Sequence, residues 1–192
     1  MAATATKNQT LVGGPVKSSG GISSAALGTT LPEKASANLD AAFTALGLAG
    51  EDGVSEKTSR GSNKVKAWGG SDARVVQDEF GVEYTFTLLE TGEVQLKEIH
   101  GAGNVEKLTD VTVDELKIKI NKDPLPNRAF VFDIKDGDTK VRIVVPNGQI
   151  TDIDEIKYTH KDVTAYALTV TAYEDGDGNN AYKYLARPKA KA

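Results

Sequence analysis

The glycines at positions 101 and 103 are the first residues whose spacing could serve chemistry, because Gly-x-Gly opens the loop that binds the pyrophosphate of a dinucleotide. That loop follows a strand and carries a third glycine. Gly101-Ala102-Gly103 follows a predicted helix and lacks the third glycine. The chain also has no P-loop, in which a glycine, four residues and Gly-Lys-Ser/Thr cradle phosphates. We therefore interpret this segment as a helix-to-strand turn and predict no nucleotide cofactor.

A second candidate is the run of alternating acidic and amide side chains near the C-terminus. Asp175, Asp177 and Asn179 occupy positions like those of the first ligands of a calcium loop. However, Asn180 stands where that loop needs glycine, and Ala186 stands where it needs a bidentate glutamate. The sequence therefore predicts a hairpin tip here, and no metal ligand.

The histidines and paired carboxylates give catalysis little support. His100 ends a predicted helix and His160 lies in a polar turn, so neither has the neighbours that a serine triad or an imidazole metal site requires. Asp152, Asp154 and Glu155 form acidic pairs of the kind that any acidic protein carries. We predict no catalytic residue and no cofactor, and we expect that the chain is not an enzyme.

Composition limits the function classes further. The chain has 192 residues, of which 39% are hydrophobic and 26% charged, as in a folded protein of about one domain. A net charge of −4 argues against a basic face that grips nucleic acid, and the absence of cysteine excludes disulfides and thiolate zinc sites. Residues 1–11 lack the basic start and apolar stretch of a signal peptide, so we expect synthesis in the cytoplasm and no membrane insertion.

The elements that would position any site fall into three parts. Residues 1–30 are mostly Ala, Thr, Ser, Gly and Lys, so we predict a flexible N-terminal arm. Residues 31–186 form the predicted β-domain, and residues 187–192 form a short basic tail. Apolar residues at 39, 42, 43 and 46, followed by Gly47, predict an amphipathic helix over 35–46. A second helix, capped by Thr91, is predicted over 92–100.

Alternating polar and apolar residues after Gly53 predict an all-β body with antiparallel pairing. Asp136-Gly137 and Asn147-Gly148 are typical of tight hairpin turns, so residues 128–158 are predicted to form a meander. The predicted strands are 54–60, 65–68, 74–79, 82–89, 113–120, 128–134, 139–145, 150–158, 163–173 and 181–186.

One predicted strand is clearly two-faced. Residues 82, 84, 86 and 88 are large and apolar, whereas Glu83, Thr85 and Thr87 point to the other side. By the same alternation, Gln77 and Glu79 belong to the polar side, which then carries no Lys or Arg. Two interpretations stay open, namely an ordinary solvated sheet face and a wall that lines a channel between several subunits. A bulge near Phe80-Gly81 would exchange the two faces.

An ordered set of short segments resembles the major tail tube proteins of long-tailed, siphovirus-type bacteriophages. The segments are Glu51-Asp52-Gly53-Val54, Lys66-Ala67-Trp68-Gly69-Gly70, Gln77-Asp78-Glu79-Phe80, Thr85-Phe86-Thr87-Leu88-Leu89-Glu90 and, before them, Ala25-Ala26-Leu27-Gly28-Thr29-Thr30-Leu31-Pro32. The match covers most of the chain and weakens after about residue 110. Trp68 is the only tryptophan, and we expect it to be an anchor in the core or at an interface.

The resemblance implies an antiparallel β-sandwich or half-barrel with a flanking helix, whose subunits join into a ring-wide β-barrel. It further implies hexameric rings that stack into the tail tube of a virion, contact a tape-measure protein and a tail terminator, and let DNA pass through the lumen. Gln77, Glu79, Glu83, Thr85 and Thr87 are the candidate lumen-facing residues. Glu51, Asp52, Gly53, Trp68, Gly69 and Gly70 are candidate interface residues.

Two alternatives remain from the residues alone. One is a monomeric β-sandwich that binds carbohydrate or mediates adhesion, which would present an exposed aromatic platform. The other is a different virion component, such as a tail terminator or decoration protein.

Overall fold

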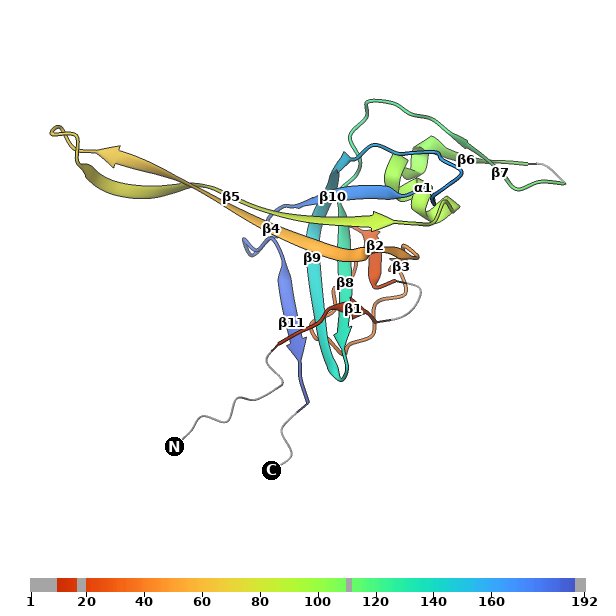
Figure 1. Ribbon diagram of the computed structural model, residues 1–192, viewed down its shortest axis with the longest axis horizontal. Helices are drawn as coiled ribbons and strands as arrows, with labels where there is room; N and C mark the ends of the chain where they lie inside the picture. Colours follow the sequence, from red (N-terminus) through yellow and green to blue (C-terminus); the bar gives the residue numbers. More distant parts are fainter. Residues whose placement is uncertain (1–9, 17–19, 110–111, 189–192) are drawn as a thin grey trace.

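The computed structural model describes residues 10–16, 20–109 and 112–188, and antiparallel strands make up most of them (Figure 1). The strands are β1 (Gly14–Pro15), β2 (Ile22–Ala26), β3 (Thr44–Ala45), β4 (Ala49–Lys66), β5 (Asp72–Leu88), β6 (Val105–Leu108), β7 (Glu115–Ile118), β8 (Arg128–Asp136), β9 (Thr139–Ile153), β10 (Tyr166–Ala172) and β11 (Tyr182–Ala186). One α-helix, α1 (Glu93–His100), and a 3-10 turn, η1 (Ala102–Asn104), join β5 to β6.

A single bent sheet forms both layers of the fold. The strand order is β3-β2-β8-β9-β10-β5-β4, with β1 on β8 and β11 on β9, while β6 and β7 form a separate two-stranded ladder. Strand β9 belongs to both layers, because residues 139–145 pair with β8 and residues from Gly148 pair with β10. Gly148 itself also pairs with Arg128 of β8. The first layer is therefore β3-β2-β8-β9 with β1 and β11, and the second layer is β9-β10-β5-β4.

The core lies between the two layers. The apolar face of β5 meets β8, where the Tyr84 and Phe132 rings stack with centroids 5.2 Å apart and Phe86 packs edge-on at 5.6 Å. Leu168 and Val170 of β10 are fully buried beside them. The predicted antiparallel β-sandwich with a flanking helix is confirmed, and α1 is that helix.

The predicted helix over 35–46 is wrong. Residues 35–42 form two short turns separated by irregular chain, with Ala37 N–H donating to the Lys34 carbonyl and Ala42 N–H to the Asp40 carboxylate. The buried Arg142 guanidinium accounts for this conformation. It donates hydrogen bonds to the carbonyl oxygens of Lys34 and Ala37 at 3.1 and 2.6 Å, and in a helix these oxygens would accept from backbone N–H groups of the helix itself. Of the four apolar residues that suggested a helix, Leu46 lies in the core, Leu39 and Phe43 are half-buried, and Ala42 is exposed.

The boundary predicted at residue 30 is also wrong. Strand β2 pairs with β8 over five residues, and Ile22 and Ala25 are buried in the sheet. The small side chains that suggested an arm fit here because the strand is enclosed on both sides. Residues 1–9 and 17–19 of the predicted arm, and residues 189–192 of the predicted basic tail, lie outside the described residues.

One of the two predicted tight turns is confirmed. Gly137 has a φ of 55° and connects β8 to β9 immediately after Asp136. Asn147-Gly148 is no turn but the corner at which β9 passes between the layers. A side chain on Gly148 would come within 2.8 Å of Phe130, so glycine permits the close packing at this corner.

The β4–β5 hairpin is the largest feature outside the body (Figure 1). Its strands contain 18 and 17 residues, so four predicted short strands are in fact two long ones, joined near Trp68. The predicted helix over 92–100 is confirmed as α1, although Gly92 rather than Thr91 is its N-cap and gives no side-chain cap. Within the described ranges, no helix is long and apolar enough to cross a membrane.

Candidate functional site

The solvent-facing side of the second layer gathers the predicted polar residues. Cross-strand pairing puts Thr85 opposite Ser55 and Glu83 opposite Lys57 on β4, and opposite Thr169 and Thr171 on β10. Directly opposed residues share a face, so this side of the layer is lined mainly by hydroxyl groups. We call it the hydroxyl face, and its residues are Ser55, Lys57, Ser59, Glu79, Glu83, Thr85, Thr87, Gln149, Thr151, Asp152, Thr169 and Thr171.

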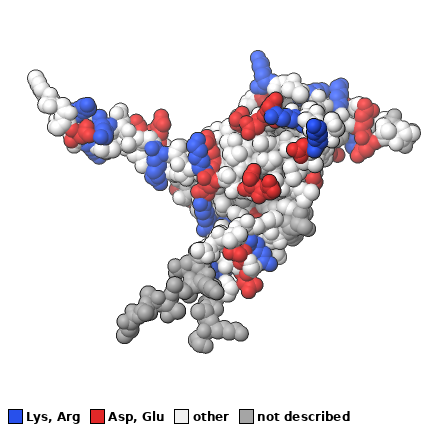
Figure 2. Space-filling view, viewed as in Figure 1, with Lys and Arg blue, Asp and Glu red and all other residues white. Residues whose placement is uncertain are grey.

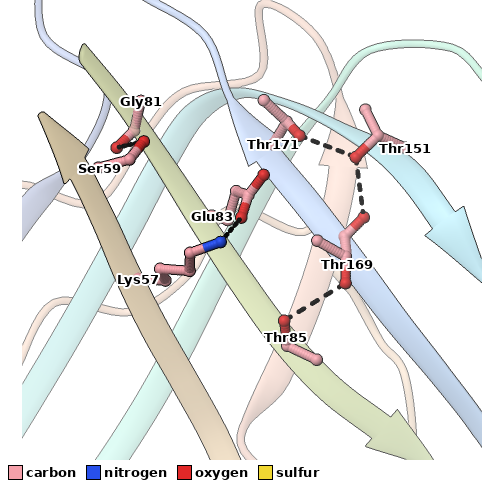
Figure 3. A network of polar contacts seen from close by, with 8 residues as sticks. All are labelled: Lys57, Ser59, Gly81, Glu83, Thr85, Thr151, Thr169 and Thr171. Atoms are coloured by element: carbon pink, nitrogen blue, oxygen red, sulfur yellow. Dashed lines mark hydrogen bonds and ion pairs between the residues drawn. The ribbon is translucent and has the colours of Figure 1, made fainter. Parts of the chain in front are cut away.

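The threonines of the hydroxyl face bond to one another (Figure 3). The hydroxyls of Thr85 and Thr169 lie 3.3 Å apart, and those of Thr151 and Thr171 lie 2.8 Å apart. Ser59 donates to the Gly81 carbonyl at 3.4 Å. In each threonine pair one hydroxyl donates to the other, so fewer hydroxyl donors are available to a passing phosphate or sugar.

The hydroxyl face contains a lysine that the sequence analysis missed. Lys57 Nζ lies 3.4 Å from Glu83 Oε2, and both side chains are well exposed. The expectation that this face carries no Lys or Arg was made from β5 alone and is wrong for the paired strands. Placing Lys57 on this face requires the register of β4 against β5, and the sequence pattern does not specify that register over so long a hairpin.

Gln77 does not lie on the hydroxyl face. Gly61 pairs with Glu79 and Ser62 with Gln77, so Asp78 is an extra residue in β5 and forms a bulge. Beyond the bulge the alternation is reversed, and Gln77 accepts a hydrogen bond from Arg60 at 3.2 Å on the opposite side of the hairpin. Arg60 also lies 4.7 Å from the centre of the Phe80 ring. The face exchange considered in the sequence analysis is real, but it occurs at Asp78.

The other four predicted residues lie on one face, as expected, at different distances from the body. They are Glu79, Glu83, Thr85 and Thr87. Thr87 is half-buried, because the backbone of Gly50 lies beside it. Glu79 lies far out along the hairpin, opposite Gly61. The structure thus brings four of the five predicted residues to one face and spreads them along its length.

The second layer has two edges without a strand partner among the described residues. Strand β4 pairs with β5 on one side only, and residues 149–153 of β9 pair with β10 alone. Unpaired edges expose rows of backbone N–H and C=O groups that favour pairing with another chain. The layer is therefore a four-stranded unit that is open at both ends.

The candidate interface residues separate into two groups at opposite ends of β4. The hairpin tip consists of Trp68, Gly69 and Gly70. Trp68 is fully exposed, which excludes the core anchor. Figure 2 shows acidic and basic side chains in close succession along the hairpin and an uncharged end. Of the two environments expected for Trp68, the core is therefore excluded, and the interface stays a prediction.

Glu51, Asp52 and Gly53 lie at the base of the hairpin in a wide bulge. Ala49 pairs with Leu88 and Val54 with Phe86, so the residues between them loop out of the ladder. Gly53 has a φ of 66°, which only glycine adopts readily. The bulge lines a groove of about 400 Å³, and the other described residues of its lining include Gly13, Gly14, Pro15, Gly20 and Gly21.

The segments considered for metal binding or catalysis form no such site. Asp175 accepts the Tyr182 hydroxyl at 2.6 Å and the backbone N–H groups of Asp177 and Asn179 at 2.9 Å, which together hold its pKa below the usual range. It thus closes the turn between β10 and β11, which are not paired with each other. Burial lowers the pKa of His100. Across the described part of the chain, no group of three or more His, Asp or Glu side chains is arranged to hold a metal ion.

Comparison with known families agrees with these features. The family model described as phage tail tube protein matches residues 4–192, nearly the whole chain. The chain belongs to the phage tail tube protein family. It is a structural component of a phage tail, and membership implies self-assembly into a tube. No curated protein matches this tail tube protein.

Proposed function

We propose that this tail tube protein forms stacked hexameric rings around a lumen through which the genome of a long-tailed phage passes into the host. The observation that carries the proposal is the four-stranded second layer, which has a hydroxyl face and two unpaired edges. Family membership supports the tube itself.

Ring closure follows from the edges. If the free edge of β4 in one subunit pairs with residues 149–153 in the next, the second layers join into one continuous barrel. Such closure satisfies the exposed backbone groups of both edges, and a closed ring leaves none unpaired.

The hydroxyl face would then line the lumen. It presents mutually bonded threonines, two glutamates, Asp152 and a lysine that is paired with Glu83, so its net charge is negative. DNA is held on proteins mainly by basic groups that displace its counterions. A wall of this composition keeps the polyanion mobile.

The remaining partners follow from the same function. A tape-measure protein fills the lumen during assembly and a tail terminator closes the tube, while DNA passes without specific binding. No cofactor, metal, membrane insertion or enzymatic activity is required, and synthesis takes place in the host cytoplasm.

Negative-stain microscopy of the purified full chain tests the proposal. We expect rings or tubes with a central hole, together with light-scattering masses that are multiples of six subunits. A solution that stays monomeric at high concentration and shows no rings would overturn the proposal and favour the monomeric binding module.

A further inference from the structure

Two prolines stand directly before β8, in the loop that connects β7 to it. Pro124 and Pro126 are both exposed, and two residues after Pro126 the chain enters β8 at Arg128. Leu125, which lies between the prolines, packs against the core. Because the proline rings themselves are exposed, packing does not explain why proline stands at these two positions.

The backbone hydrogen bonds of β8 show which strand the prolines would face. The N–H of Asp133 donates at 2.7 Å to the carbonyl of Gly21, which comes directly before β2. Pairing of β8 with β2 is regular over residues 128–132. Successive residues of a strand direct their backbone groups to opposite neighbours, so odd-numbered residues of β8 face β2 and even-numbered residues face β9. If β8 began earlier in the chain, positions 124 and 126 would therefore face β9.

The open edge of β9 lies where an earlier start of β8 would run. Arg128 pairs with Gly148, so position 126 would stand opposite Ile150. The Asn147 carbonyl accepts at 2.8 Å from the backbone N–H of the residue that follows β10, and pairing with β10 is regular over residues 148–150 of β9. By the same alternation, the N–H and C=O of Ile150 point away from β10 and toward the open edge.

Proline cannot complete a ladder at this edge because it has no backbone N–H. In an antiparallel pair, the N–H at position 126 would donate to the Ile150 carbonyl, and the next N–H on that side would come from position 124. Proline removes both donors. Within the described chain, no backbone hydrogen bond joins residues 121–127 to residues 149–153, and the Gln149 side chain instead donates to the Leu125 carbonyl at 2.6 Å. The loop is thus attached to the start of the edge without pairing to it.

We propose that Pro124 and Pro126 keep the edge at residues 149–153 open for a strand of a second copy of the chain, because they prevent β8 from pairing with it. β8 has the shortest route to this edge, since it already pairs with β9 up to Gly148. Natural sheets use proline to exclude unwanted pairing of this kind. The inference rests on the proposed tube, in which this edge accepts β4 of the next subunit.

Restoring the two backbone donors tests the proposal in the full chain. Pro124→Thr with Pro126→Val introduces N–H groups and side chains that favour strands. In the dilute, unassembled subunit, hydrogen exchange of the Ile150 amide should slow at least about tenfold, because this N–H gains a partner. The concentration needed for assembly should rise at least about tenfold, because the edge is then occupied. Pro126→Val alone restores the donor opposite Ile150 and should change both quantities in the same direction.

Two control variants separate this effect from other consequences of the substitutions. Pro188→Thr removes an exposed proline that follows β11, and it should leave both quantities unchanged. Gln149→Ala removes the side-chain bond that attaches the loop and retains both prolines, so exchange at Ile150 should not slow. Equal slowing in the Gln149→Ala variant would contradict the role assigned to the prolines.

The outcomes distinguish this inference from the proposed function. Unchanged exchange at Ile150 in the double variant would overturn the inference. Tubes that form as readily as those of the wild type, although exchange has slowed, would overturn it as well, and neither result contradicts the tube itself. If the wild type forms no rings or tubes while exchange slows in the double variant, the proposed function fails and the prolines still account for the open edge.

Discussion

At the residue scale, two buried charged side chains hold other parts of the chain against the first layer. Arg142 holds the turns at 35–42, and Glu98 holds the helix α1. Arg142 forms a bidentate pair with Asp133, through bonds of 2.6 and 2.9 Å, and donates to two carbonyls of the covering turns. Glu98 attaches α1 to the sheet, since it accepts from Ser24 at 3.0 Å and lies 3.0 Å from Arg128. Neither role is visible in the sequence, where both residues look like ordinary surface charges.

Replacement of Arg142 by alanine should destabilise the subunit by about 3–5 kcal/mol, because it leaves the Asp133 carboxylate and the turn carbonyls without their donor. Chemical denaturation followed by circular dichroism measures the loss. Lys157→Ala removes an exposed ion pair and should cost less than about 0.5 kcal/mol. Equal effects of the two variants would contradict the assigned role of Arg142.

Burial raises the pKa of Glu98, and this effect exceeds the opposing effects of Arg128 and of the Ser24 hydrogen bond. An acid with a raised folded-state pKa binds more protons in the folded than in the unfolded state. Its contribution to stability is present at low pH and lost as the pH rises from about 4.5 through the raised value. Glu98→Gln lacks this titration, so the wild type should lose stability relative to the variant over that pH window. Denaturation at several pH values checks it, and the opposite trend would show that Arg128 dominates.

At the element scale, the local residue pattern correctly predicted the elements whose conformation does not depend on contacts with distant residues. The helix α1 and the face carrying Glu83, Thr85 and Thr87 follow from spacing alone. The turns at 35–42 and the corner in β9 do not, because they depend on contacts with distant residues such as Arg142 and Phe130. The bulge at Asp78 does not either, because it depends on the register of β5 against β4. Asn147-Gly148 is an example, because a glycine in the sequence is equally compatible with a tight hairpin turn and with a tightly packed corner within a strand.

The corner can be tested at Gly148. A methyl group there would lie 2.8 Å from Phe130 and 2.9 Å from Val170, so Gly148→Ala should destabilise the fold by about 1–3 kcal/mol. Gly176→Ala is the matched control, because nothing lies within 4 Å of its added methyl group. Thermal denaturation of both variants compares them, and a stable Gly148→Ala variant would rule out close packing as the reason for this glycine.

At the scale of the whole molecule, the sign of charge on the hydroxyl face is the property that matters for a tube. Glu79→Lys combined with Glu83→Lys should leave folding and assembly largely intact, because both positions are solvent-accessible. The change places a lysine beside Lys57 and adds phosphate contacts around every ring, each worth about 1 kcal/mol, so genome delivery should fall at least about tenfold.

Genome ejection into host cells or liposomes at matched particle number measures this effect. Glu115→Lys with Asp123→Lys makes the same change of charge at exposed positions outside the second layer and serves as the control. Unchanged delivery by the hydroxyl-face variant, or a structure of the tube with Glu83 on its outer wall, would contradict the lumen assignment.

The length of the β4–β5 hairpin also affects how the free subunit moves in water. A slender arm that extends well beyond the body adds friction with little mass, so this 20.3 kDa chain diffuses more slowly than a sphere of equal mass. On a sizing column it elutes early, at the volume of a larger particle, even as a monomer. If the proposed assembly packs the arm against a neighbouring subunit, that drag is removed, and early assembly then raises the mass faster than the apparent radius. The ratio of the two quantities therefore reports when the hairpin leaves the solvent.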